Sequence, residues 1–210
     1  SNCQVQGNGI TDVTAQNGIQ IGYGADATIT DCDIDGIAWD GPDWVASGIL
    51  CYLADNVDIN GSCNVTNAQA CIYIQGTNGS VEGASVSAAD IAAAEGITIR
   101  DYAYNKGNVN DVAYREAQPL IEDYQDNYTK GAPTSVSVNN VSLTGEAVTE
   151  TYGLAVWSLG DDVTVTIDNS EITNWDYGLV IYESGSVASL TAHGNSVFNN
   201  ATYAGWTNTA

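Results

Sequence analysis

The chain has 210 residues, 44% of them hydrophobic, which is enough for one domain with a continuous core. Its 26 acidic and 4 basic side chains give a formal net charge of -22, which argues against a nucleic-acid partner because phosphates attract basic surfaces. No apolar run approaches the roughly 20 residues that cross a bilayer, so we expect no membrane insertion. The absence of methionine favours a processed, exported protein, and the acidic composition favours an extracellular location.

A short apolar motif that usually starts with glycine recurs along the chain. It occupies residues 18–21, 48–51, 71–74, 96–99, 153–156 and 178–181, with cysteine in place of glycine at position 71. Segments with period-two alternation, typical of β-strands, lie between these copies at 27–29, 57–59, 136–138 and 163–167. Each repeat has a third apolar position, which we assign to Ile10, Ile34, Val65, Val86, Leu143, Ile172 and Phe198.

Three short strands per repeat cannot bury their apolar sides in isolation, but repeats stacked on one another bury them in one continuous core. We therefore predict an all-β, right-handed parallel β-helix solenoid of about seven turns, forming a single domain over residues 1–210. The repeat resembles that of the pectate-lyase-like superfamily over residues 1–100 and 134–210. This resemblance is specific for the architecture and says little about activity.

Residues 101–133 interrupt the repeat as an insertion. They contain three of the four basic side chains, Lys106, Arg115 and Lys130, among several tyrosines. An apolar spacing after Asn110 predicts a partly helical segment, which Pro119 ends or divides. Insertions in stacked repeats project on one face, so this segment either binds a ligand or covers apolar surface of the stack.

The same resemblance raises the question of an enzyme. Polysaccharide lyases of the superfamily hold calcium with acidic residues and abstract a proton with Arg or Lys. Arg100 is the one basic residue on the predicted repeat body, and with Asp101 beside it we interpret it as half of a surface ion pair. The superfamily's hydrolases use a Gly-His-Gly motif, whereas the only histidine here, His193, aligns with Asp168 in a turn. No catalytic motif of the family is present residue by residue, so we predict no catalytic residues and no enzyme.

Acidic residues cluster at two places in the predicted stack. Asp31, Asp33 and Asp35 alternate along an extended segment, which directs two carboxylates to one side, and we interpret them as surface residues rather than an acid–base pair. Other aspartates follow the glycine-marked strands at one corner, where turns lie roughly 4.8 Å apart and a cation would relieve their repulsion. The solenoid requires no cofactor, but this corner is a candidate Ca2+ site formed by Asp26, Asp55, Asp161 and Asp162.

Aromatic side chains predict a strip on the outer surface. Tyr73 and Tyr182 alternate outward from their strands, and such a strip serves a carbohydrate or a neighbouring subunit equally well. The other candidate members are Trp39, Trp44, Trp157, Trp175, Trp206, Tyr23 and Tyr52.

The chain contains five cysteines. Cys32 and Cys63 stand two residues before the apolar positions Ile34 and Val65, hence at equivalent places in consecutive turns, and we predict a disulfide between them. Cys51 alternates inward and is predicted to be a buried apolar residue. Because the count is odd, at least one cysteine is unpaired or joins another chain, and the candidates for an intermolecular disulfide are Cys3 and Cys71.

Two further features bear on export and assembly. Neither end of the sequence shows a capping helix, so we expect open strand edges that pair with other copies of the chain. Asn-x-Ser/Thr sequences agree with export, and the candidate glycosylation sites are Asn60, Asn64, Asn78, Asn127, Asn140 and Asn200.

These features together predict an exported structural subunit of a self-assembling sheath, tube or surface layer, held by β-strand pairing and intermolecular disulfides. In composition the chain is similar to archaeal surface-layer proteins and methanogen sheath proteins. Its expected partner is a further copy of itself, with cell-envelope polysaccharide as a second candidate. The leading alternative is a polysaccharide lyase or hydrolase, or a carbohydrate-binding β-helix module, with Arg100 as the candidate base. A fragment of a tailspike-like adhesin is a third interpretation.

Overall fold

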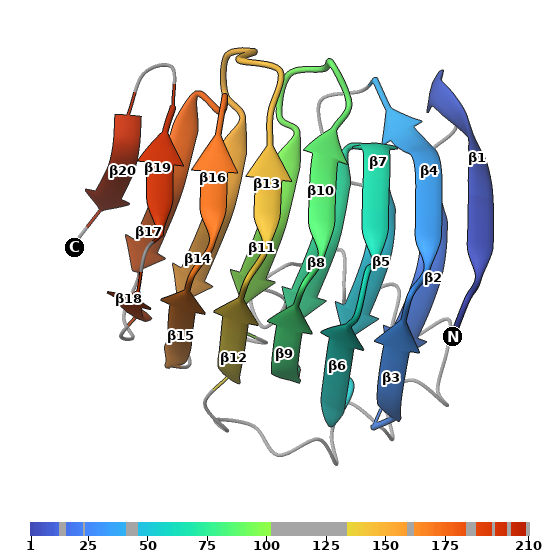
Figure 1. The fold of residues 1–210 in the computed structure, drawn as a ribbon, viewed down its shortest axis with the longest axis horizontal. Helices are drawn as coiled ribbons and strands as arrows, with labels where there is room; N and C mark the ends of the chain where they lie inside the picture. Colours follow the sequence, from blue (N-terminus) through green and yellow to red (C-terminus); the bar gives the residue numbers. More distant parts are fainter. Residues whose placement is uncertain are drawn as a thin grey trace, which may run out of the picture.

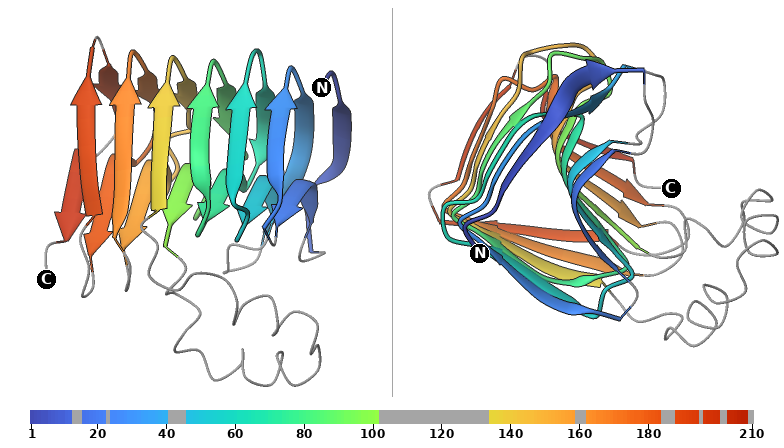
Figure 2. Two further views of the ribbon diagram at one scale, coloured as in Figure 1. Left: turned by 90° about the horizontal axis from the view of Figure 1, so that it is seen from below. Right: turned by 90° about the vertical axis from the view of Figure 1, so that its right-hand side faces the viewer.

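The structure, a computed structural model, describes residues 1–12, 16–22, 24–40, 46–101, 134–158, 162–183, 188–194, 196–200 and 203–208. Within these ranges every regular element is a β-strand, and the strands form three parallel sheets of seven, seven and six strands (Figure 1). Viewed along the stacking direction, the sheets form the three sides of a prism around a common interior (Figure 2). The predicted all-β parallel solenoid of about seven turns is confirmed.

Each of the first six turns contributes one strand to each sheet, in the order A, B, C, and the last turn contributes its described strands to sheets A and B. Sheet A contains β1 (Gln4–Thr11), β4 (Asp33–Trp39), β7 (Asn64–Ala68), β10 (Ser85–Ala88), β13 (Ser142–Thr144), β16 (Glu171–Thr173) and β19 (Val197–Asn199). Sheet B contains β2 (Asn17–Gly22), β5 (Ser47–Tyr52), β8 (Ala70–Gln75), β11 (Glu95–Arg100), β14 (Tyr152–Ser158), β17 (Tyr177–Glu183) and β20 (Tyr203–Asn208). Sheet C contains β3 (Asp26–Thr30), β6 (Asn56–Asn60), β9 (Asn78–Glu82), β12 (Thr134–Asn139), β15 (Val163–Asp168) and β18 (Ala188–His193).

The core is built from ladders of β-branched and other aliphatic residues that point inward from successive turns. The glycine-marked strands of sheet B align in register, so that Ile49 stacks on Ile72, Ile97 and Leu154. All four of these side chains are fully buried. Because alternate residues of a strand point to opposite faces, the period-two pattern of the sequence places one apolar row inside in every turn.

Tight corners join sheet C to sheet A. One residue at each corner has a positive φ, a conformation that costs a β-carbon-bearing residue energy and that Gly, Asn and Asp adopt most readily. The residues at this position are Asp31, Gly61, Gly83, Asn140, Asn169 and Gly194. This requirement explains why Asn, Asp and Gly recur before the third apolar position of each repeat.

The first turn departs from the sequence prediction. Val5, and not Ile10, aligns with Ile34 at the third apolar position, whereas Ile10 lies near the end of β1 and pairs with Ala38. The register of β1 against β4 also shifts between Gln6 and Gly9. Ile10 is 49% exposed. The proposed insertion lies, after Asp101, outside the described residues. The described ranges contain no helix long and apolar enough to cross a membrane.

Candidate functional site

The outer face of sheet B carries the most chemically varied row of side chains in the described structure. Parallel pairing places five residues from consecutive turns side by side, and we call this row the Arg100 ladder. Its members, in order, are Tyr52, Gln75, Arg100, Trp157 and Tyr182. The row therefore combines a cation, an amide and three aromatic rings along the stacking direction.

Arg100 lies at the centre of this ladder and is held by aromatic groups. Its Nη1 donates a hydrogen bond to the Tyr73 hydroxyl at 2.7 Å. The guanidinium carbon is 5.9 Å from the Tyr73 ring centroid and 5.5 Å from that of Trp157, within the range of cation–π attraction. Trp157 in turn lies 5.2 Å from the Tyr182 ring, centroid to centroid. Arg100 is 4% exposed, so its charge is shielded from water by its surroundings.

The prediction that Arg100 and Asp101 form an ion pair on the surface is wrong about their exposure. Both residues are buried, with Asp101 completely so. The error arose because alternation assigns the end of β11 to the outside of the solenoid, whereas every residue of this strand is buried. The alignment of His193 with Asp168 is confirmed, since the two are in register and the His193 Nδ1 lies 3.5 Å from Asp168 Oδ1 on the surface.

Glu95, at the start of the same strand, is a buried carboxylic acid that the sequence interpretation missed. It is 1% exposed, and its Oε2 accepts a hydrogen bond from the Thr98 hydroxyl. The other oxygen, Oε1, has no hydrogen-bond partner in the structure. Burial raises the pKa of Glu95 to about 7, against the Thr98 hydrogen bond and the attraction of Arg100, which lower it.

Tyrosines line the sheet next to Glu95. Glu95 is in register with Tyr152, whose ring lies 5.5 Å from that of Tyr177, centroid to centroid. Burial, and then the nearby Glu95 carboxyl, raise the pKa of Tyr152. A signal for Glu95 was present in the sequence, because it occupies the position directly before the strand glycine that other repeats fill with small or aromatic residues.

The predicted aromatic strip is therefore shorter than expected. Tyr73 and Tyr182 are on the outer face of sheet B as predicted, together with Tyr52 and Trp157. Trp175 is instead completely buried in the core, and Trp39 is partly buried against it. Tyr23, Trp44 and the side chain of Trp206 lie outside the described residues.

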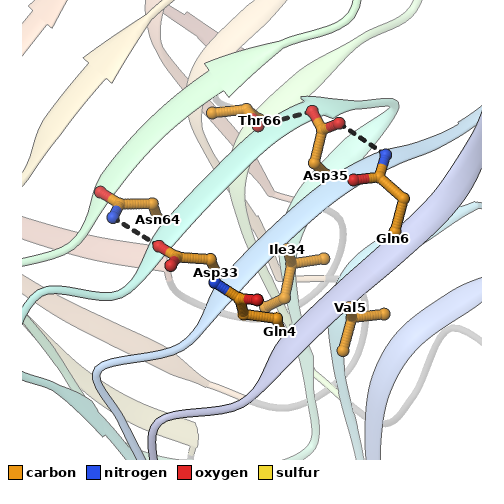
Figure 3. A pocket seen from close by; sticks show the side chains of 8 residues that line it. All are labelled: Gln4, Val5, Gln6, Asp33, Ile34, Asp35, Asn64 and Thr66. Carbon is orange, nitrogen blue, oxygen red and sulfur yellow. Dashed lines mark hydrogen bonds between the residues drawn. The ribbon is translucent and has the colours of Figure 1, made fainter.

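A second candidate region is a polar groove on the outer face of sheet A (Figure 3). It has a volume of about 720 Å³, and Asp33 and Asp35 project into it from β4 while the side chain of Ile34 between them is in the core. The prediction that this segment directs two carboxylates to one side is confirmed.

Amide and hydroxyl donors from the neighbouring turns occupy both carboxylates of the groove. Asp33 Oδ1 accepts from Asn64 Nδ2 at 2.8 Å. Asp35 accepts from Gln6 Nε2, Thr66 Oγ1 and Asn67 Nδ2, each at 2.7 Å, and these bonds lower its pKa. These interactions tie turns together, which agrees with a structural role rather than an acid–base pair.

The structure places the described aspartates of the proposed calcium corner at two separate levels of the stack, with Asp26 and Asp55 in neighbouring turns and Asp162 further along. Asp26 begins β3 and Asp55 precedes β6, whereas Asp162 precedes β15, and strands β9 and β12 lie between β6 and β15. Asp161 lies outside the described residues. No group of three metal-ligating side chains was found in the part of the chain that the structure describes. The four aspartates therefore do not form one cluster, because Asp162 lies several turns from Asp26 and Asp55, and calcium binding stays a prediction.

Cys32 and Cys63 occupy neighbouring positions in consecutive turns, as predicted, but they are free thiols in the structure. Each thiol donates to a backbone carbonyl of its own corner, Cys32 to Thr30 at 3.4 Å and Cys63 to Asn60 at 3.3 Å. The Cys32 amide donates to Cys63 Sγ at 3.5 Å. The disulfide stays a prediction, and the thiols satisfy their hydrogen bonds without it.

The other cysteines separate into buried and exposed ones. Cys51 is buried, as predicted, and burial raises its pKa to about 12. Cys71 is also completely buried, and its thiol donates to the Ala68 carbonyl at 3.8 Å. A side chain in this position does not reach a second chain without local unfolding, so Cys71 is a poor candidate for an intermolecular disulfide. Cys3 is exposed and stays the candidate.

The candidate glycosylation sites contribute to the cross-turn bonding of the solenoid. The Asn64 and Asn200 amide nitrogens, which a glycan would modify, donate to Asp33 and to the Ile172 carbonyl. Asn78 and Asn140 are exposed, which makes them the more accessible sites. The Asn60 oxygen accepts a hydrogen bond from Thr30, and Asn127 lies outside the described residues.

No protein-family model, curated protein or solved structure matches the chain.

Proposed function

We propose that the chain is an exported structural solenoid that assembles with copies of itself through the two ends of the stack. The observation that supports this proposal is the incomplete burial of core-facing residues in the outermost described turns. Val5, Ile19 and Ile21 at one end are only partly buried. Their counterparts one turn further in are 1%, 0% and 0% exposed, and these are Ile34, Ile49 and Cys51.

The opposite end has the same character. Leu179, Leu190 and Phe198 point toward the core and are likewise only partly buried. Each end therefore presents apolar side chains surrounded by backbone groups of outer strands. Burying apolar area of this kind stabilises association by about 25 cal/mol for every Å² removed from water.

Strand pairing adds direction to the contact. In the described structure β1 and β2 each have one hydrogen-bonded neighbour, and so do β19 and β20 at the other end. A second copy whose β1 and β2 pair with β19 and β20 would continue sheets A and B in parallel and extend the apolar core. Because the two ends differ, this contact is head-to-tail and leads to rings or filaments.

The first test is assembly of the 210-residue chain itself, followed by electron microscopy and sedimentation velocity with and without a thiol reductant. We expect filaments, rings or sheets, and loosening by the reductant if Cys3 joins chains. A monomer in every condition would contradict the proposal.

A pair of variants on β2 tests whether the end of the stack forms the contact between copies. Ile21→Asp sets a charge among the partly buried end residues, whereas Gln20→Asp sets the same charge on the outer face of the same strand. We expect the first variant to lower the assembled fraction at least tenfold and the second to leave it within twofold. Circular dichroism of both variants checks that the fold is kept.

Carbohydrate binding on sheet B is the second candidate function. The observation that favours it is the Arg100 ladder, where Trp157 and Tyr182 provide half-buried rings of the kind on which sugar rings stack. Arg100 and Gln75 add donors for hydroxyl or carboxylate oxygens. No proton abstraction is part of this proposal.

Calorimetric titration with acidic and neutral polysaccharides tests the second candidate. Trp157→Ala is expected to weaken binding at least tenfold, because it removes the central ring of the ladder. Thr164→Ala, on the exposed face of sheet C, is the matched control. The absence of any binding heat with the unmodified protein would contradict this function.

A further inference from the structure

Glu95 is an acidic group buried in a strand where both faces are covered. Its carboxyl is 1% exposed, one oxygen accepts from Thr98, and the other has no hydrogen-bond partner. A carboxylate in this position would lose its hydration and gain little in return, whereas the neutral acid keeps its proton and avoids that cost. No step of the proposed assembly uses this residue, so its burial calls for a separate explanation.

The ionisable groups around Glu95 do little to stabilise a negative charge there. Cys71 on β8 and Tyr152 on β14 are neutral near pH 7, because burial, and to a smaller extent the nearby Glu95, raise the pKa of each. Among the described residues the cation that attracts Glu95 is Arg100, whose guanidinium is already engaged by the Tyr73 hydroxyl and two rings.

Further acidic groups lie beyond Tyr152. The charges and titratable groups that act on Tyr152 are Glu95, Glu150, Asp176 and Tyr177. Glu150 and Asp176 are connected, since the Glu150 amide donates to Asp176 Oδ2 at 2.9 Å. An ionised Glu95 would therefore add negative charge to a region that already contains two acidic residues and a pair of tyrosines.

We propose that Glu95 is a proton-linked switch that controls the local stability of sheet B around β11 and β14. The protonated form packs between Ala70 and Tyr152 in the parallel ladder. Loss of the proton places an unpaired charge inside the sheet and favours opening of these strands. The device is independent of how the ends of the solenoid assemble.

The direction of the pH effect follows from the two protonation states. The folded protein holds the Glu95 proton up to about pH 7, while the unfolded chain releases it near the ordinary value of 4.5. Between these limits the folded state binds more protons, so stability falls as pH rises. The contribution is complete below about pH 4.5 and lost above about pH 7.

Thermal melting between pH 4.5 and 8.5 tests the switch in three proteins: the unmodified chain, Glu95→Gln and Glu171→Gln. The glutamine at position 95 keeps the shape of the neutral acid, while Glu171 is an exposed residue on sheet A and controls for the general effect of the high negative charge. We expect the melting temperature of the unmodified chain and of Glu171→Gln to fall across this range by about 5–10 °C more than that of Glu95→Gln. Parallel curves for all three proteins would overturn the proposal.

A direct titration keeps the proposal testable even if Glu95→Gln does not fold. The unmodified chain labelled with 13C at glutamate side-chain carboxyls is followed by NMR from pH 4 to pH 8.5. One carboxyl resonance is expected to titrate near pH 7. Above that pH, amide hydrogen exchange at Ile97 and Leu154 is expected to speed up by more than the intrinsic, base-catalysed increase that every amide shows. Titration of every glutamate below about pH 5.5 would show that Glu95 is charged at neutral pH and would refute the switch.

Discussion

At the scale of single residues, Trp175 shows how one large side chain fixes several elements. It is completely buried, and its Nε1 donates to the Leu143 carbonyl at 3.1 Å, which links the corner after β16 to β13. Trp175→Ala should lower the free energy of unfolding by about 3–5 kcal/mol, because it leaves a cavity and an unpaired carbonyl. Urea denaturation followed by circular dichroism measures this, with Thr164→Ala expected to stay within about 0.5 kcal/mol.

Residues also mark the limits of prediction from sequence. Tyr73 and Cys51 were placed correctly because alternation along a strand decides which face a side chain is on. The same rule assigned Arg100 to the outside without revealing its burial, since burial on the outer face depends on contacts that alternation does not encode. The calcium corner shows a related limit, because the alignment of aspartates by motif does not show how many turns separate them.

At the scale of elements, the corners between sheets C and A are the most sequence-dependent part of the fold. Asn140 has a φ of 52° and an exposed side chain, so its backbone conformation rather than its contacts defines its role. Asn140→Ala should destabilise the protein by about 1 kcal/mol, while Asn140→Gly should change stability by only a few tenths. Both variants remove the same glycosylation sequence, so equal effects in thermal melting would argue against a backbone origin.

Elements were predictable to different degrees. The seven turns and the three strands per turn followed from the recurrence of glycine and apolar residues, because a parallel stack repeats the same environment at each level. The first strand was assigned incorrectly at Ile10, since β1 spans eight residues and carries two apolar positions, of which Val5 aligns with Ile34 and Ile10 with Ala38. Irregular turns give no periodic signal, so the sequence pattern does not predict their structure.

At the scale of the whole molecule, the net charge of -22 opposes the proposed contact between copies. Salt screens such repulsion, with a Debye length of about 30 Å at 0.01 M and about 10 Å at 0.1 M ionic strength. The fraction of assembled chain in sedimentation experiments should therefore rise at least severalfold between these two conditions. A fraction that falls with added salt would mean that attraction between opposite charges, rather than apolar burial and strand pairing, holds the copies together.

The parallel registry of the three sheets has a mechanical consequence. Hydrogen bonds between neighbouring turns run along the stacking direction, while the strands lie across it. A force applied along the stack would therefore break the hydrogen bonds of one turn before those of the next. It would not have to break all the bonds of a sheet at the same time. In single-molecule stretching, such a molecule would lengthen in steps of one turn at a low and nearly constant force.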